Sequence, residues 1–460
     1  MKRYLFFLRS HNDTDNIAPA LWFLLEDDSS AIVDIAYYHF DFPYLSHPYI
    51  RALKARFGDR LKILWIGNFL GLDYADLFEH KRIPSAQAVR LREFFKLDRS
   101  SFDRVFKTRR PLEWRAIALA RHIWGPTTLS ISNLTAAASH ISARSLDIPQ
   151  TVRQQFVAWL IGKEPTPCLA VFDHQRGPSL QGLFDALRSA GVEKIVRLPV
   201  SPMVNINILR RARYVVPTRE RLQSELDFTG FDAVAYTDRY YPENLRRFFV
   251  DMGWGDPLKG KLAVVGAIRY CPEWLALRPQ PSVFSSPDTD DRIKLAFFLS
   301  RAETNAYWDE VKRTIQVLGS FLHFRVVIQP HPRDVSTLEN GDRRIEINTQ
   351  VSAPSLIEWA DVVMLWGSSV GLEALIKGKT MLYLGYVNAN LSLYEKFRAG
   401  WVLRCRDDLA LALRKLERDR RTREYQQADV DRLIQEVVLA GDSKPVPTRY
   451  LDFLRANEKT

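Results

Sequence analysis

Short runs of apolar, mostly β-branched or aromatic residues alternate along this chain with longer segments whose apolar residues recur every three or four positions. The runs are typical of buried strands in a parallel sheet, and the wider spacing is typical of amphipathic helices. The first half therefore predicts strands over 4–8, 31–36, 61–66, 168–172, 194–198, 214–216 and 233–236, with helices over 17–25, 47–57, 178–189 and 238–250. Strands and helices in alternation predict a doubly wound α/β sheet.

The alternation resumes after the Gly- and Pro-rich segment 253–260, which is the predicted linker. The segment KLAVVGAIRYCPEW follows and is predicted to open the second domain with a strand. Further strands are expected over 293–299, 324–329, 361–366 and 380–384, with helices over 306–318 and 407–417. Because 460 residues are many for one core, we predict two Rossmann-like domains, residues 1–255 and 256–460.

Residues 84–162 interrupt the alternation of the first domain with apolar residues at helical spacing only. Helices are predicted over 86–95, 112–123, 134–142 and 150–161. We interpret this stretch as a helical insert in the first domain, of the kind that shapes a groove for an acceptor.

Two predicted strands of the second domain end in polar residues. The residues that follow the runs 324–329 and 361–366 are His331, Arg333, Gly367, Ser368 and Ser369. A helix that carries Glu373 comes next, and the strand over 380–384 completes a βαβ unit. In parallel sheets, ligands bind beyond the carboxyl ends of the strands, so these residues are the first candidates for a site.

The residue types in this cluster suit a nucleotide. Two serine hydroxyls near a helix start favour a phosphate, and His331 can donate to the same phosphate while negative charge develops on a leaving group. Glu373, about one turn into the helix, is placed to accept from a ribose hydroxyl. Taken alone, a Ser-Ser pair is an ordinary helix cap and a His-Pro pair an ordinary loop, but these alternatives do not explain the three together.

The order HPR, strand, SSVGLEAL and GK before the next strand resembles the nucleotide-binding half of GT-B transferases of bacterial surface polysaccharides. The nearest groups are CDP-glycerol glycerophosphotransferases, capsular Kdo transferases and bacterial sialyltransferases that use CMP-sugars. UDP-N-acetylglucosamine 2-epimerase shares the architecture and a similar Ser-rich turn. The resemblance covers roughly the last two fifths of the chain. It implies a GT-B-like fold whose two domains face across a cleft, with a ribose ligand at Glu373 and a donor-phosphate site at His331, Arg333, Gly367, Ser368 and Ser369.

Two predicted strand ends of the first domain carry polar residues that a buried sheet does not need. One end contains His11, Asp13 and Asp15, and the other contains Asp173 and His174. In a GT-B enzyme the acceptor's base comes from this domain, and an inverting transfer needs one carboxylate or imidazole within hydrogen-bond reach of the acceptor hydroxyl. We favour Asp13 as the base, then His174, with Asp173 and His11 as further candidates. A helix cap is the alternative reading of Asp13, and a cap or turn residue that of Asp173.

The function that these features predict is a metal-independent, inverting glycosyltransferase or polyol-phosphate transferase. The resemblance implies that it moves a group from a nucleotide-activated donor, a CMP-sugar or CDP-linked compound, to a bacterial surface glycan or lipid-linked glycan, as in capsule or lipopolysaccharide synthesis. The strand near residue 195 ends in LPVSP, where related chains carry histidine and glycine after the proline. One rival is a UDP-N-acetylglucosamine 2-epimerase-like enzyme, and another is a non-catalytic scaffold with a nucleotide fold.

Composition and charge narrow the class of partner. A net charge of +11 favours acidic partners such as nucleotide sugars and the anionic inner leaflet of a membrane. The basic helix near 414–423 is read either as a solvated face or as a peripheral membrane contact.

The three cysteines form no CxxC pair, which argues against a zinc site and fits a reducing, cytoplasmic compartment. No apolar stretch approaches about 18 residues, so no membrane span is expected.

Other nucleotide and metal chemistries lack their motifs. The chain contains neither GxxxxGK[ST] nor GxGxxG. Of its two DxD sequences, the one at 288–290 lies in a predicted surface loop and the one at 13–15 belongs to the polar strand end described above, so neither suits a metal-dependent GT-A transferase. No RNA-binding motif accompanies its basic segments. We therefore expect no metal, no cofactor and no nucleic-acid partner.

Overall fold

A computed structural model describes residues 2–8, 11–37, 44–69, 71, 73–75, 150–162, 165–173, 178–199, 201–206, 228–279, 284, 291–300, 306–331, 345–348 and 351–458. Within these residues the strands form two sheets, of seven and six strands, and every strand pair is parallel. The predicted strand 214–216 and three of the four helices predicted for the insert lie outside the described residues. The fourth is present as α9 (Gln150–Ile161).

The first sheet has the order β3-β2-β1-β4-β5-β6-β7, so the strand order reverses between β1 and β4. Its strands are β1 (Lys2–Leu8), β2 (Ala31–Tyr37), β3 (Leu61–Trp65), β4 (Leu169–Phe172), β5 (Ile195–Arg197), β6 (Ala233–Tyr236) and β7 (Leu262–Val264). The helical segments of this half are α1 (His11–Asp27), η1 (Tyr44–Ser46), α2 (Pro48–Phe57), η2 (Gly58–Arg60), α3 (Ile66–Phe69), α9, α10 (Pro178–Ser189), α12 (Tyr240–Asp251), η4 (Ile268–Tyr270) and α13 (Pro272–Leu277).

The second sheet has the order β10-β9-β8-β11-β12-β13 and reverses between β8 and β11. Its strands are β8 (Ile293–Phe298), β9 (Phe324–Gln329), β10 (Ile345–Ile347), β11 (Val362–Leu365), β12 (Thr380–Leu384) and β13 (Trp401–Leu403). The helical segments are α14 (Trp308–Gly319), α15 (Ala353–Trp359), α16 (Val370–Ile376), α17 (Leu393–Phe397), α18 (Arg406–Arg418), α19 (Gln427–Leu433), the π-helical turn η5 (Ile434–Val438) and α20 (Val446–Ala456).

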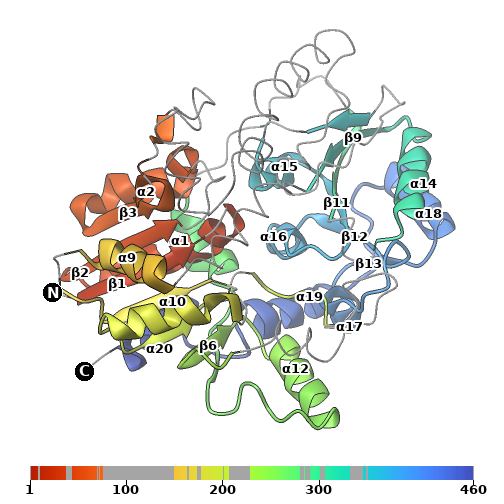
Figure 1. The fold of residues 1–460 in the computed structure, drawn as a ribbon. Coiled ribbons are helices and arrows are strands. Elements are labelled where there is room, and N and C mark those ends of the chain that lie inside the picture. The colour runs from red at the N-terminus through yellow and green to blue at the C-terminus, as the bar shows by residue number, and fades with distance from the viewer. Residues whose placement is uncertain are drawn as a thin grey trace, which may run out of the picture.

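Each sheet has its own hydrophobic core. The central strands are buried along almost their whole length, as continuous apolar runs predict for a sheet covered on both faces. Figure 1 shows the first sheet with α2, α9 and α10 on the left and the second sheet with α14, α15, α16 and α18 on the right. The prediction of two Rossmann-like sheets is confirmed.

Two segments cross between the halves, and the sequence indicated only the second crossing, that of the final helices. The strand predicted to open the second domain is β7, and it pairs with β6 as the last strand of the first sheet. That assignment was wrong because an apolar run does not reveal which sheet it joins. At the other end of the chain, α20 packs into the first core through Val446 and Tyr450, and Lys2 Nζ lies 2.6 Å from Glu458 Oε2. Both chain ends therefore lie beside the first sheet (Figure 1), and the boundary at 255/256 stays a prediction.

The first helix begins earlier than predicted. Helix α1 starts at His11, so Pro19 lies in its interior instead of its first turn. Proline has no backbone N–H, so Pro19 cannot donate to the carbonyl of Asp15 four residues earlier. The early start also places Asp13 in the first turn of the helix, which brings the polar residues after β1 onto regular, fixed backbone.

The crossing point after β7 depends on Gly266. Its φ of +90° lies in the region that favours glycine, and a Cβ there would stand 2.8 Å from Val438 O and 2.9 Å from Val446 Cγ2. Neighbouring hydrogen bonds fix the same point, because Ala267 N donates to Val438 O at 2.8 Å and Tyr450 Oη donates to Gly266 O at 3.1 Å.

We therefore expect Gly266→Ala to lower the free energy of unfolding by about 2–4 kcal/mol, the sum of a left-handed backbone and an overpacked contact. Gly253→Ala is the matched control, since Gly253 has a φ of +69° but open space where its Cβ would stand. Urea unfolding followed by circular dichroism measures both variants. Equal losses in the two would show that the contact with Val438 and Val446 is unimportant.

Candidate functional site

The carboxyl ends of the central strands of the second sheet lie level with one another. Phe298 of β8 pairs with Gln329 of β9 on one side and with Leu365 of β11 on the other. The chain therefore leaves β9, β8 and β11 at the same edge, where the strand order reverses. Open α/β sheets bind ligands at this point. The residues after β9 and β11 are those that the sequence singled out.

Ser369 is hydrogen-bonded to the first half of the chain. Ser201 Oγ donates to Ser369 Oγ at 2.9 Å, and Tyr270 Oη donates to the same oxygen at 3.1 Å. Ser201 follows β5, and Tyr270 lies in η4 after β7. Polar side chains from the carboxyl ends of both sheets therefore meet at Ser369.

The turn before Ser369 requires glycine. Gly367 has a φ of +55°, and a Cβ there would lie 3.1 Å from Asn205 Nδ2. Asn205 forms an antiparallel bridge with Ser392, and Leu393 N donates to Val204 O at 2.8 Å. The segment 201–206 thus lies directly against the turn after β11, and a side chain at Gly367 would be strained by the positive φ and would displace the Asn205 amide.

Of the other residues predicted to bind the donor phosphate, the structure describes His331 and Ser368. His331 follows β9 and is partly buried, one strand away from the Gly367 turn, with β8 between them. After β8, Ser300 Oγ donates to Trp366 O at 2.5 Å and so fixes the backbone just before Gly367. Arg333 lies outside the described residues. Ser368 is partly exposed, and its Oγ accepts from Val370 N at 3.4 Å.

Glu373 is held by an arginine from the other half of the chain. It is 2% exposed, and its Oε1 lies 2.5 Å from Nη2 of Arg278, which is 5% exposed. Burial acts to lower the pKa of Arg278, but the hydrogen bond and the charge of Glu373 raise that pKa above its ordinary value. Helix α13 precedes Arg278 and packs into the first core through Trp274. A ribose hydroxyl would have to share the Glu373 carboxylate with Arg278.

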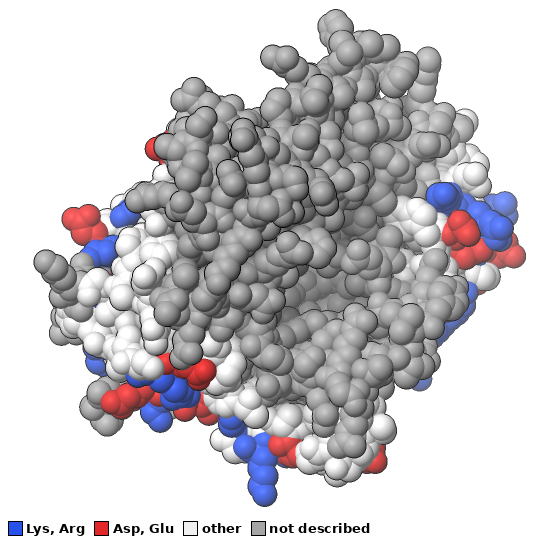
Figure 2. Space-filling model, in the orientation of Figure 1, with Lys and Arg blue, Asp and Glu red and all other residues white. Residues whose placement is uncertain are grey.

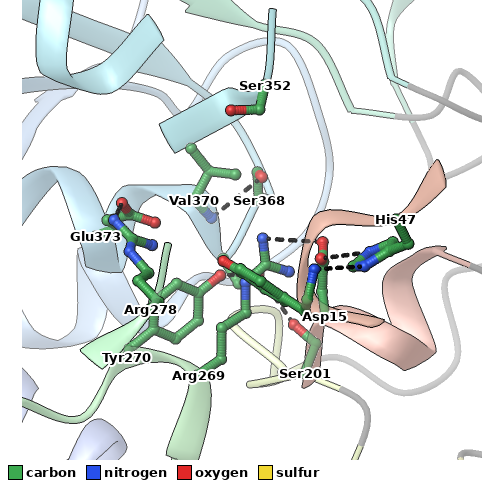
Figure 3. Close-up of polar contacts among 12 residues, drawn as sticks. Asp15, His47, Ser201, Arg269, Tyr270, Arg278, Ser352, Ser368, Val370 and Glu373 are labelled. Carbon is green, nitrogen blue, oxygen red and sulfur yellow. Dashed lines mark hydrogen bonds and ion pairs between the residues drawn. The ribbon is translucent and has the colours of Figure 1, made fainter. Parts of the chain in front are cut away.

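A second polar cluster lies at the edge of the first sheet. Asp15 Oδ1 is 3.1 Å from His47 Nε2, and Asp15 Oδ2 is 3.2 Å from Arg269 Nη2. His47 Nδ1 accepts from Tyr49 N at 3.3 Å, so the ring proton is on Nε2 and His47 donates to Asp15. Figure 3 shows Asp15 between His47 and Arg269, with the Arg278–Glu373 pair on the far side of Tyr270.

Three of the four residues predicted as acceptor bases lie within the described residues. Asp13 in α1 and Asp173 after β4 are both 0% exposed. Phe7 of β1 pairs with Phe172 of β4, so both carboxylates lie where the first strand order reverses. His11 is the first residue of α1, and His174 lies outside the described residues. The choice of base among them stays a prediction.

One buried acid at the same edge has a strongly shifted pKa. Asp238 follows β6, is 1% exposed, and accepts from Thr237 Oγ1 at 2.9 Å and Tyr240 N at 3.0 Å. Burial raises the pKa of Asp238 to about 6, although these hydrogen bonds act to lower it. The carboxylate is thus ionised at pH 7 at a cost to stability.

The contacts around Asp15, Ser369 and Glu373 form a junction between the two halves of the chain. Sequence reasoning missed five residues of this junction, which are His47, Ser201, Arg269, Tyr270 and Arg278. Periodicity locates elements, but it does not reveal which side chains meet across two sheets. The sequence did carry one signal, since LPVSP at the end of β5 was noted as a departure from related chains. The serine of that segment is the one that contacts Ser369.

In Figure 2, Lys and Arg lie next to Asp and Glu on the described parts of the visible face. In the basic stretch near 414–423, Lys415 pairs with Glu424 at 2.5 Å and Arg420 with Asp291 at 3.2 Å. These pairs fit a solvated face, while a membrane contact stays a prediction.

Of the helices that the structure describes, none has the length and apolar character of a membrane span. The described residues contain no group of three His, Cys, Asp or Glu side chains that could hold a metal ion.

Comparison with known proteins places this geometry in a known architecture. No family model and no curated protein sequence matches the chain. A protein described as a UDP-N-acetylglucosamine 2-epimerase from Listeria monocytogenes is similar over 99% of this chain and 96% of its own, with 13% identity and a TM-score of 0.51. The S. aureus MnaA structure with UDP has 12% identity, the same coverage of 99% and 96%, and a TM-score of 0.51. Arabidopsis thaliana UGT89C1, complexed with UDP, is similar over 99% of each chain, with 13% identity and a TM-score of 0.53.

Together with the two parallel sheets, these likenesses show that the chain has the GT-B fold. The predicted fold class is therefore confirmed. Identities of 12–13% show a shared fold alone. The reaction does not follow from the fold, because one fold supports many reactions.

The buried ion pair between the halves leads to a first prediction for this junction. Glu373→Gln leaves the charge of Arg278 buried without its counter-ion, so we expect it to lower the free energy of unfolding by about 3–5 kcal/mol. Glu26→Gln is the control, because Glu26 pairs with Arg56 at 2.8 Å while both side chains are about half exposed, and it should change stability little. Denaturant unfolding compares them, and equal effects would contradict the importance of the pair.

Asp238 gives a pH-dependent prediction. Because its pKa in the folded chain is about 6 against an ordinary 3.8, its contribution to stability is fully present below pH 3.8 and is lost as the pH rises through 6. We expect Asp238→Asn to be more stable than wild type by about 2–3 kcal/mol at pH 7 and equally stable near pH 3.5. Thermal unfolding at both pH values tests this. Asp442→Asn is the control, since a backbone hydrogen bond from Lys444 lowers the pKa of Asp442; a gain at pH 7 in this variant too would contradict the assignment.

Proposed function

We propose that the protein is a GT-B transferase that binds a nucleotide-activated donor at the carboxyl edge of the second sheet. The observation that carries the proposal is the turn from Gly367 to Ser369 at the reversal of strand order, with Ser369 contacted by Ser201 and Tyr270. A GT-B enzyme needs its donor and acceptor between two sheet edges, and hydroxyl groups from both edges converge here. UDP in the MnaA and UGT89C1 structures supports a nucleotide as the ligand.

The chemistry that we propose is an inverting, metal-independent transfer of a sugar or polyol phosphate. His331, Arg333 and the two serines would hold the donor phosphate and offset the charge that develops on the leaving group. Glu373 would hold the ribose, and Asp13, His174, Asp173 or His11 would take the proton of the acceptor hydroxyl. Since Asp13 and Asp173 are 0% exposed, an acceptor reaches them only after neighbouring side chains move.

The donor that we propose is a CMP-sugar or a CDP-linked compound, and the acceptor a bacterial surface glycan. The support is the resemblance of HPR and SSVGLEAL to polysaccharide transferases that use cytidine nucleotides. A second candidate is a UDP-N-acetylglucosamine 2-epimerase-like reaction, which the likeness to the Listeria monocytogenes protein favours. The two differ in the base of the nucleotide, so ligand binding separates them.

The test is a thermal-shift panel of the purified chain with CMP, CDP, UDP, GDP and ADP. A nucleotide at one hundred times its dissociation constant stabilises the folded chain by about 2.7 kcal/mol. We expect a cytidine nucleotide to stabilise wild type, and the double variant Ser369→Ala, His331→Ala to lose this effect. His323→Ala is the control, because His323 precedes β9 at the opposite edge of the sheet from His331.

A shift with uridine nucleotides alone would favour the epimerase. Stabilisation that survives in the double variant would place the nucleotide elsewhere. If no nucleotide stabilises wild type, the transferase proposal fails and the non-catalytic scaffold becomes the better reading. With a cytidine response, CMP-sugars and CDP-polyols are then assayed with glycan acceptors by mass spectrometry.

A further inference from the structure

The segment that leaves the first sheet after β7 carries a cation and a hydroxyl to the Ser369 turn. Tyr270 Oη donates to Ser369 Oγ at 3.1 Å, and the guanidinium carbon of Arg269 lies 5.6 Å from the centre of the Tyr270 ring. Figure 3 shows the Arg269 guanidinium between Asp15 and Tyr270. A positive group from the first half therefore lies beside the expected phosphate position.

Arg269 is buried for an arginine and retains an unused donor. Its side chain is 12% exposed, and its Nε is buried without a hydrogen-bond partner among the residues that the structure describes. Leaving a buried N–H of a charged group without an acceptor is costly, so such a group points to an acceptor that completes the site. Phosphate oxygens suit the planar guanidinium best, because two N–H groups can bind them together.

The guanidinium is also held in place before any ligand binds. One oxygen of Asp15 forms an ion pair with Arg269 and the other accepts from His47, so the carboxylate is held from both sides. Burial acts to lower the pKa of Arg269 while the charge of Asp15 raises it, and the net shift is upward, so the cation persists at any physiological pH. A cation held in this way loses little entropy when an anion binds.

We propose that Arg269 and Tyr270 bind the phosphate groups of the donor together with Ser369, so that the anion site is built by both halves of the chain. The identity of the ligand as a nucleotide rests on the proposed function, but the anion subsite stands on the contacts of Arg269, Tyr270 and Ser369 alone. A phosphate oxygen takes the hydrogen bonds that Tyr270 and Ser201 now give to Ser369.

A second arginine provides a matched comparison. Arg239 also follows a strand of the first sheet, lies 5.6 Å from the ring centre of the next tyrosine, and pairs at 2.7 Å with Glu436 in the second half. It differs in being 56% exposed, and Tyr240 contacts Glu436 where Tyr270 contacts Ser369. Arg239 thus reproduces the ion pair and the aromatic neighbour without the buried site.

The experiment measures the affinity of purified wild type, Arg269→Gln, Tyr270→Phe and Arg239→Gln by calorimetry, with inorganic pyrophosphate and with each nucleotide of the panel. We expect Arg269→Gln to weaken both kinds of ligand by about tenfold to a hundredfold, the loss of a charged hydrogen bond, and Tyr270→Phe by about threefold to tenfold. Arg239→Gln should bind as wild type does. Arg269→Lys keeps the charge without the planar fork, so it should fall between wild type and Arg269→Gln.

The outcomes separate this inference from the proposed function. If nucleotides bind equally to wild type and Arg269→Gln, the subsite is wrong while the transferase proposal stands. If only pyrophosphate binds, and does so through Arg269, the subsite stands and the nucleotide proposal fails. Binding of neither ligand to wild type overturns both. If Arg269→Gln does not fold, unchanged affinity in Arg269→Lys and Tyr270→Phe overturns the subsite.

Discussion

Parallel pairing of β8 with β11 is the constraint on which the site depends. Each crossover returns the chain to the same edge, so all strands of the second sheet end on one side. The strand order of the sheet reverses between these two strands, and open α/β sheets bind ligands at such a point. Gly367 turns the chain at this point, and Ser369 then faces the first half. The position of the candidate site therefore follows from sheet topology before any side chain is considered.

The two halves are joined at this edge by polar contacts in addition to apolar ones. Val204 follows β5 and Tyr270 follows β7, both strands of the first sheet, yet the two residues pack in the core of the second. Around them lie the Ser201–Ser369 hydrogen bond and the buried Arg278–Glu373 pair. Buried ion pairs add little net stability because desolvation offsets the attraction. The pair joins Arg278, which follows α13 of the first half, to Glu373 in α16 of the second.

The sequence predicted elements well and contacts between sheets poorly. The strands β9 and β12 were predicted at their observed residues because a buried strand is a local pattern of apolar side chains. The partner of a strand is not local, and so β7 was assigned to the wrong half. The sequence placed His331 and the Gly367–Ser369 turn directly after β9 and β11 because strand ends are visible in sequence, and their role in binding stays a prediction. The sequence did not single out Arg269. This residue lies in a short turn, and its ion pair is with Asp15, more than two hundred residues earlier in the chain.

The halves are joined by two kinds of polar contact, the hydroxyl hydrogen bonds at Ser369 and the ion pair between Arg278 and Glu373. The hydroxyl groups that now donate to Ser369 can donate instead to a phosphate oxygen, and such charge-assisted hydrogen bonds are shorter and stronger than neutral ones. The Arg278–Glu373 pair cannot be exchanged in this way, because separating the pair would leave a charge buried alone. A ligand at Ser369 would therefore loosen the first kind and leave the second intact.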